Sequence, residues 1–283
     1  MNAPGVQRIA AFSDGVQGGN PAGVWIGTAL PPDETMQRVA FEVGYSETVF
    51  AAPFGDGWRV RYFSPEAEVP FCGHATIALG AALAASHGDG TYALALNDAR
   101  ITVEGQCTTA ADGTPLVSSA LQSPPTHSSI APAPAVERAL ALFGYRQEDL
   151  DPRIPPALAH GGAPHLVLAL RSRALLAAMR YDLDAGRAFM RELGIVTVVL
   201  AWAESDTLFH TRNPFAAGGV YEDPATGAGT AALAGYLRDL GWPHGGAIDV
   251  VQGEDMGMRS RLHAGISTVK GGSIRVSGTA RPL

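Results

Sequence analysis

The chain is poor in cysteine and in basic residues. Cys72 and Cys107 are its two cysteines in 283 residues, too few for a disulfide framework, and none of the usual paired spacings of zinc ligands occurs. Lys and Arg number 20 against 27 Asp and Glu, which gives a formal net charge of −7. Proteins that bind nucleic acid usually carry basic patches, so we expect no nucleic-acid partner.

Long apolar runs are also missing. The most apolar stretches, residues 75–85 and 194–203, are too short to span a bilayer. Residues 1–11 lack the basic region and long apolar core that mark a signal peptide. We therefore expect a cytoplasmic protein without a membrane partner.

The length of the chain favours two domains, each able to bury a core. Residues 123–134 are rich in Pro, Ser and Ala, which predicts an extended and exposed linker. Strand-like segments such as 165–170 and 195–202 alternate with helix-like segments such as 183–193 and 227–240. We predict an α+β fold with an N-terminal lobe (1–122), a linker (123–134) and a C-terminal lobe (135–283), whose last strand is able to pack on the N-terminal lobe.

The clearest chemical motif lies in residues 70–80. His74 follows Gly73 and precedes an apolar run with helical spacing, so it should lie at a helix N-terminus. Unpaired backbone N–H groups and the positive end of the helix dipole favour an anion there, and a carboxylate substrate is the natural ligand. A helix cap or a satisfied core histidine is the alternative interpretation of His74.

The pattern Gly-x-x-Thr-x-Ala-Leu occurs twice, once from Gly73 and once from Gly227. Either the chain contains a duplication or a short match arose by chance in an alanine-rich sequence. A duplication would provide two helix N-termini that face one ligand.

Three charged residues are candidates for the chemistry. Glu47 begins an apolar strand, where partial removal from water would make its carboxylate a better proton acceptor, although a solvated strand end is the simpler interpretation. Asp223 precedes a proline, so its carboxylate should stand free near the second helix start or cap it. Arg212 is either a partner for a substrate carboxylate or a surface charge.

Four motifs together carry a resemblance to a known family. They are Gly-Asn-Pro-Ala at 19–22, Ser-Glu-Thr at 46–48, Phe-Cys-Gly-His-Ala-Thr at 71–76 and Glu-Asp-Pro-Ala-Thr-Gly at 222–227. In this order they resemble the PhzF-like phenazine-biosynthesis isomerases, a family related to diaminopimelate epimerase. Gln-Gly at 252–253 and Lys-Gly-Gly-Ser at 270–273 extend the likeness over nearly the whole chain.

The resemblance implies two similar lobes, each a mixed, mostly antiparallel, barrel-like sheet around a central helix, with the active site in the cleft between the lobes. It also implies a homodimer that uses neither metal nor organic cofactor. Glu47 would be the general acid/base that moves a proton on the substrate, while His74 and Asp223 would orient and help to protonate the ligand. The residues expected to bind substrate are Asn20, Ser46, Gly73, Arg212, Gly227 and Ala228.

Two differences from the related patterns bear on the mechanism and on the substrate. Cys72 matches one catalytic cysteine of diaminopimelate epimerase, but Pro224 stands at the other position, so we do not expect a two-cysteine racemase. Ala228 replaces the serine that is usual in the PhzF-like family. Beside the isomerase, two alternatives remain: an amino-acid racemase or epimerase that uses Glu47 with another acid, and a non-catalytic small-molecule binding protein.

Overall fold

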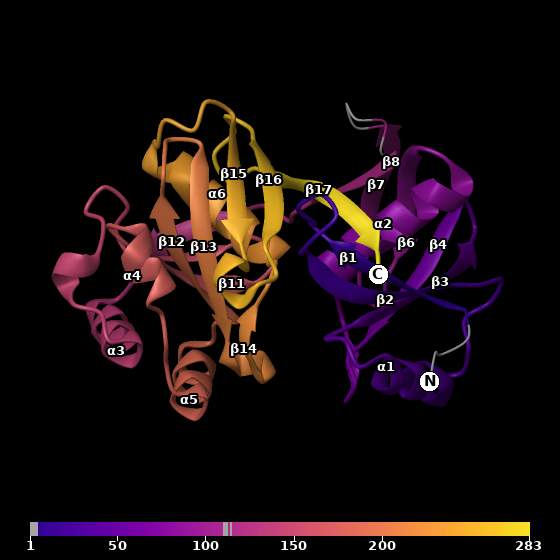
Figure 1. Ribbon diagram of the computed structural model, residues 1–283, viewed down its shortest axis with the longest axis horizontal. Helices are drawn as coiled ribbons and strands as arrows, with labels where there is room; N and C mark the ends of the chain where they lie inside the picture. The colour runs from indigo at the N-terminus through magenta and orange to yellow at the C-terminus, as the bar shows by residue number, and fades with distance from the viewer. Residues whose placement is uncertain (1–4, 110–112, 114) are drawn as a thin grey trace. The chain divides into compact units, whose positions relative to one another are not determined.

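A computed structural model describes residues 5–109, 113 and 115–283 (Figure 1). The chain divides into two compact units: unit 1 consists of Met1–Gln122 and Ser277–Leu283, and unit 2 consists of Ser123–Val276. Strand β17 (Ile274–Pro282) begins in unit 2 and pairs with β1 in unit 1 through its last residues.

Unit 1 is a mixed sheet wrapped around one helix. Its strands in sheet order are β17, β1 (Val6–Ala11), β2 (Asn20–Ile26), β3 (Thr48–Phe54), β4 (Gly57–Phe63), β6 (Gly90–Ala95), β7 (Arg100–Thr109) and β8 (Pro115–Gln122). The pairs β2–β3 and β4–β6 are parallel, and the other pairs are antiparallel. The short strand β5 (Glu68–Val69) pairs with β4.

The central helix of unit 1 is α2 (Gly73–His87). It is buried continuously from His74 to Ala84, as expected for a helix that is apolar all round. The helix lies very close to β7, because a Cβ atom at Gly105 would sit 2.2 Å from the carbonyl oxygen of Gly80. This close packing fixes where the N-terminus of α2 lies relative to the sheet. On the outside, α1 (Asp33–Val43) packs Met36 and Ala40 against the sheet.

Unit 2 is built in the same way around α6 (Gly227–Leu240), which is buried from Gly229 to Leu237. Its strands in sheet order are β9 (His127–Ile130), β10 (Ala157–His160), β11 (Pro164–Ala169), β12 (Thr197–Ala203), β13 (Leu208–Phe215), β15 (Ala247–Gln252) and β16 (Ser260–Ile266). The parallel pairs are β11–β12 and β13–β15, and β14 (Val220–Asp223) pairs with β13.

The two units share one topology. In unit 1, α1 connects the first parallel pair of strands and α2 connects the second; in unit 2 these places are taken by α4 (Arg173–Ala177) with α5 (Leu183–Leu193), and by α6. Each central helix also follows a short strand, β5 or β14. The predicted α+β fold of two similar lobes, each a mixed sheet around a central helix, is confirmed, and the shared topology favours duplication over chance.

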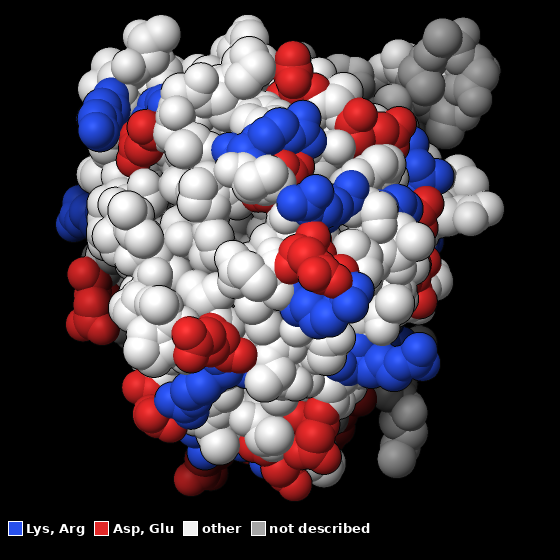
Figure 2. All heavy atoms as spheres, turned by 90° about the vertical axis from the view of Figure 1, so that its left-hand side faces the viewer, with Lys and Arg blue, Asp and Glu red and all other residues white. Residues whose placement is uncertain are grey.

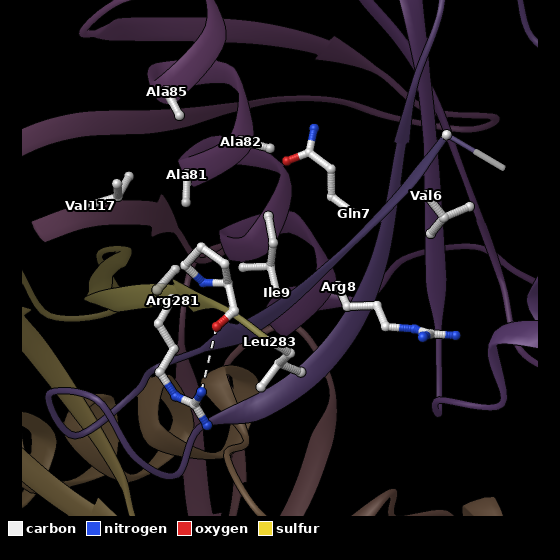
Figure 3. A pocket seen from close by; sticks show the side chains of 13 residues that line it. Val6, Gln7, Arg8, Ile9, Ala81, Ala82, Ala85, Val117, Arg281 and Leu283 are labelled. Carbon is white, nitrogen blue, oxygen red and sulfur yellow. Dashed lines mark hydrogen bonds between the residues drawn. The ribbon is translucent and has the colours of Figure 1, made fainter. Parts of the chain in front are cut away.

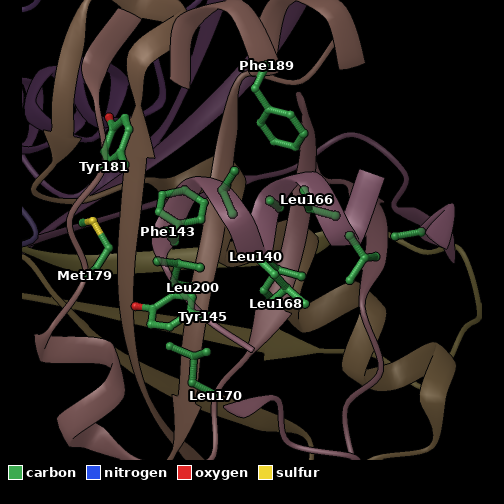
Figure 4. Packing of buried hydrophobic residues seen from close by; sticks show 14 of the residues in the cluster. Leu140, Phe143, Tyr145, Leu166, Leu168, Leu170, Met179, Tyr181, Phe189 and Leu200 are labelled. Carbon is green, nitrogen blue, oxygen red and sulfur yellow. The ribbon is translucent and has the colours of Figure 1, made fainter. Parts of the chain in front are cut away.

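An outer layer of helices covers the sheet of unit 2. Figure 4 shows Leu140 and Phe143 of α3 (Ala133–Phe143) packed with Leu168 and Leu200 of the sheet. The described part of the chain also contains the short 3₁₀ helices η1 (Gln147–Asp149), η2 (Ala216–Gly218) and η3 (Glu254–Met256).

The Pro- and Ser-rich segment 123–134 differs from its predicted exposed conformation. It contains β9, which pairs with β10, and Ser123, Thr126 and Ala131 are buried. The hydroxyl of Thr126 donates to the carbonyl of Gly272 at 3.0 Å, so a polar side chain that favours exposure in isolation is satisfied inside unit 2.

The face of the molecule in Figure 2 shows basic and acidic side chains interspersed. Among the described residues, no helix has the length and apolar character needed to cross a bilayer.

Candidate active site

Glu47 and His74 come together in unit 1. The Nε2 atom of His74 lies 3.4 Å from Oε2 of Glu47 and 3.4 Å from Oγ of Ser46. The side chain of Glu47 is 16% exposed and that of His74 is 8% exposed. The backbone carbonyl of Glu47 accepts a hydrogen bond from the N–H of Gly23 at 3.1 Å, which ties the acid to the start of the parallel pair β2–β3. A half-buried carboxylate is therefore held beside an imidazole.

Cys72 is the residue that precedes α2, and its side chain provides no cap hydrogen bond. Its Sγ atom lies 3.3 Å from Nδ1 of His74, and its carbonyl accepts from the hydroxyl of Thr76 at 2.7 Å. The hydroxyl of Thr76 is also 2.7 Å from that of Tyr62. Burial raises the pKa of Tyr62, so this phenol stays protonated. The chain of bonds fixes the first turn of α2, whose backbone N–H groups can receive an anion.

In unit 2, Asp223 ends β14 opposite Asn213 of β13. Its carboxylate accepts a hydrogen bond from the hydroxyl of Thr226 at 2.5 Å. The prediction that this carboxylate stands free is therefore wrong, because the residue just before α6 holds it. Thr226 immediately precedes α6, but its hydroxyl is bonded to Asp223 and does not cap the N-terminus of the helix.

Gln252 is a site residue whose role sequence reasoning missed. It is 1% exposed and lies at the end of β15. Its amide nitrogen donates to the carbonyl of Asp223 at 2.7 Å, and its amide oxygen accepts from the N–H of Thr226 at 3.1 Å. Gln252 thus fixes the segment that carries Asp223 into α6. The Gln-Gly pair at 252–253 was the available signal, but it carried no information about which residues it would contact.

Arg212 is not available for the substrate carboxylate that we expected it to bind. It is 7% exposed and makes two hydrogen bonds to Glu222, at 3.0 and 2.5 Å. It also donates to the carbonyl of Ala177 at 3.0 Å. Burial alone would lower the pKa of Arg212, but the hydrogen bond and charge of Glu222 outweigh it and raise the pKa. The arginine therefore has a structural role within unit 2.

The other predicted residues lie at the starts of elements. Asn20 is buried at the first position of β2, opposite Ala11. Gly73 and Gly227 are the first residues of α2 and α6, and Ala228 is the half-buried second residue of α6. Within unit 1 the structure brings together Ser46, Glu47, Gly73 and His74; within unit 2 it brings together Asp223, Gly227 and Ala228.

Unit 1 also contains a pocket of about 520 Å³ away from these residues (Figure 3). Ile9 of β1 and Ala81 and Ala82 of α2 contribute to its apolar wall, and Arg8 and Arg281 lie at its edge. The lining includes none of the candidate site residues, so this pocket is separate from the Glu47–His74 pair.

Two lobes of one topology, each a mixed sheet around a buried central helix, define a diaminopimelate epimerase-like fold. The chain belongs to the family described as phenazine biosynthesis-like protein, whose model matches residues 9–283. Its relatives are named isomerases, and this chain is accordingly an isomerase.

Two relatives and one solved structure illustrate the match. An uncharacterized isomerase of Deinococcus radiodurans is 33% identical, covering 83% of this chain and 76% of the relative. The trans-2,3-dihydro-3-hydroxyanthranilate isomerase of Pseudomonas aeruginosa is 30% identical, covering 90% of this chain and 88% of the relative. The crystal structure of a Bacillus anthracis phenazine biosynthesis protein of the PhzF family has a TM-score of 0.83 at 20% identity, covering 98% and 96% of the two chains.

Proposed function

We propose that this isomerase moves a carbon-bound proton by general acid/base catalysis on a small metabolite that carries a carboxylate. Glu47 takes the proton from one carbon and returns it to another. The observation that carries this proposal is the 3.4 Å contact between a half-buried Glu47 carboxylate and His74 at the start of α2. A positioned acid/base of this kind contributes a factor of about 10²–10⁴ in rate.

The charge that develops when the proton leaves needs nearby hydrogen-bond donors. The backbone N–H groups in the first turn of α2 and the ring of His74 are suitable donors, because a helix N-terminus favours negative charge. We propose that Asp223 and the start of α6 act on the same substrate. The shared topology supports this step, since it gives Gly73 and Gly227 equivalent places in their lobes.

The substrate that should be tried first is trans-2,3-dihydro-3-hydroxyanthranilate, which the Pseudomonas aeruginosa relative is named for. Ala228 lacks the hydroxyl that serine would place on the first turn of α6. If the two enzymes share a substrate class, Ala228→Ser should lower KM for this compound, because the added hydroxyl supplies one more donor. A raised KM would indicate a substrate that fills the space beside Ala228.

The product distinguishes isomerisation from the alternatives. With wild-type protein in heavy water, proton NMR should show a moved double bond and deuterium at the carbon that received the proton. An inverted centre without a moved double bond would identify a racemase or epimerase. A ligand that binds but exchanges no proton and forms no product would identify a binding protein.

We also propose, from the family resemblance, a cytoplasmic homodimer that needs no metal or organic cofactor. Sedimentation equilibrium should give twice the mass of the 29.4 kDa chain. Dialysis against a chelator should leave turnover undiminished, and a loss that added metal restores would contradict the proposal.

A further inference from the structure

We propose that Glu47, Cys72 and His74 form a binding site for a zinc ion, and that bound zinc inhibits the enzyme. The site rests on the positions of three side chains of unit 1, whose donor atoms all lie within 4.8 Å of one another. Its inhibitory effect rests on the proposed function of Glu47 as the proton acceptor.

The distance between the imidazole and carboxylate donor atoms suits one tetrahedral ion. Zinc binds sulfur at about 2.3 Å and nitrogen or carboxylate oxygen at about 2.0–2.2 Å, so its ligand atoms lie about 3.3–3.6 Å apart. The distance from Nε2 of His74 to Oε2 of Glu47 is 3.4 Å, and from the same nitrogen to Sγ of Cys72 it is 4.0 Å. Because Sγ lies nearer to Nδ1, at 3.3 Å, the side chain of Cys72 must turn its thiol toward the Nε2 side of the ring to complete the geometry.

The donor set selects zinc over the harder divalent ions. Magnesium and calcium prefer oxygen ligands, whereas a thiolate with an imidazole and a carboxylate suits zinc. Metal binding displaces the thiol proton of Cys72, and the N-terminus of α2 favours the thiolate that forms. Three protein ligands leave the fourth position open for water or for a substrate oxygen.

The backbone that carries the three side chains is held in place before any metal arrives. Cys72 and His74 bracket the start of α2, whose first turn is fixed by the hydrogen bond from Thr76 to the carbonyl of Cys72. Glu47 is tied to β2 through the N–H of Gly23. The ligands come from two segments distant in sequence, which explains why no paired zinc spacing appears in the chain.

Bound zinc would stop proton transfer at its first step. A carboxylate that coordinates zinc has its lone pairs committed to the metal and cannot take a proton from carbon. His74 would lose the ring nitrogen that faces Glu47. Substrate and zinc should therefore compete.

Cobalt(II) is the probe for the site, because a thiolate bound to cobalt gives a charge-transfer absorption in the near ultraviolet. The full-length protein is titrated with cobalt under anaerobic conditions. Wild-type protein should bind one equivalent of cobalt and show this absorption. Added zinc should displace the cobalt and abolish the absorption. Cys107→Ser is the matched control, since Cys107 is exposed and lies outside the cluster.

The proposal predicts that Cys107→Ser keeps the cobalt absorption and that Cys72→Ser loses it while circular dichroism shows an unchanged fold. Glu47→Gln, which retains the thiol, should keep the absorption but weaken cobalt binding by at least about tenfold. Absence of the absorption in wild-type protein, or its loss in Cys107→Ser with retention in Cys72→Ser, overturns the site.

Turnover measurements separate the two parts of the proposal. Saturating zinc should abolish wild-type turnover, and a chelator should restore it. Turnover that persists while zinc occupies the cobalt site overturns the inhibition. If cobalt binds as predicted but the protein turns over none of the tested substrates, the metal site stands and the proposed function fails.

Discussion

At the scale of single residues, Arg212 and Glu222 form a buried ion pair that stabilises unit 2. Both side chains are less than a tenth exposed, and the guanidinium also bonds to the carbonyl of Ala177. Removing one partner of such a pair leaves a buried charge without compensation and costs about 3–5 kcal/mol. Replacing both partners by apolar residues avoids that cost.

Arg212→Met should therefore lower the free energy of unfolding by about 3–5 kcal/mol in urea titrations, and the double replacement Arg212→Met with Glu222→Met should recover part of the loss. The control Arg146→Met removes an arginine that is 74% exposed and should change stability by less than about 1 kcal/mol. An Arg212→Met variant of unchanged stability but raised KM would restore the substrate-binding role.

His165 makes the stability of unit 2 depend on pH. It is 1% exposed on β11, and its Nδ1 atom lies 2.8 Å from the hydroxyl of Thr197. Burial, with a smaller contribution from His160, lowers the pKa of His165 to about 3. In the unfolded chain a histidine titrates near 6.5, so between these values the unfolded state binds one more proton and stability falls as pH falls.

Between pH 6.5 and pH 4.5 the wild type should lose about 2–3 kcal/mol more unfolding free energy than His165→Asn, which does not titrate. Urea titrations at each pH provide the midpoint and slope from which the free energy of unfolding is calculated. His87→Asn, at an exposed position, should follow the wild type. Parallel pH curves for wild type and His165→Asn would show that the buried ring does not account for the loss.

At the scale of secondary-structure elements, the contact of α2 with β7 positions the site. Gly105 of β7 lies under the helix, where an added Cβ would meet the backbone of Gly80. Gly90, directly opposite Gly105 on β6, has open space, with the nearest atom at 4.0 Å. Neither glycine has a positive φ, so space alone distinguishes them.

Gly105→Ala should thus lower the free energy of unfolding by about 1–3 kcal/mol, because a backbone contact cannot yield. Gly90→Ala should change it by less than about 0.5 kcal/mol. Thermal and urea unfolding of the two variants provide the comparison. Equal effects would mean that α2 can move away from β7 without cost.

The elements that were predicted well from the sequence are those with a local signal, such as helical spacing of apolar residues and a glycine after the last turn. The segments 183–193 and 227–240 are the observed α5 and α6, each followed by a glycine in the left-handed conformation. Strand β10, with the sequence Ala-Leu-Ala-His, was missed because it contains no β-branched residue and depends on its neighbours β9 and β11.

At the scale of the whole molecule, the predictable parts of the site are those that lie within local sequence motifs. Glu47, His74 and Asp223 belong to motifs at strand ends and helix starts, so the sequence alone identified them as candidates. The role of Gln252 depends on the end of β15 lying beside the segment before α6, and the burial of Arg212 depends on the pairing of β13 with β14. Such contacts between elements leave no periodic signal in the sequence.

The central claim is that Glu47 takes the proton from carbon, and the turnover rate of Glu47→Gln tests it most directly. Glutamine keeps the shape and hydrogen bonding of the side chain but cannot accept the proton. Once wild-type turnover of a substrate is established, Glu47→Gln should bind it with similar affinity and turn it over at least about 10²-fold more slowly. The control Glu42→Gln, on the exposed face of α1, should keep the wild-type rate. A Glu47→Gln variant that turns over the substrate at the wild-type rate would contradict the account.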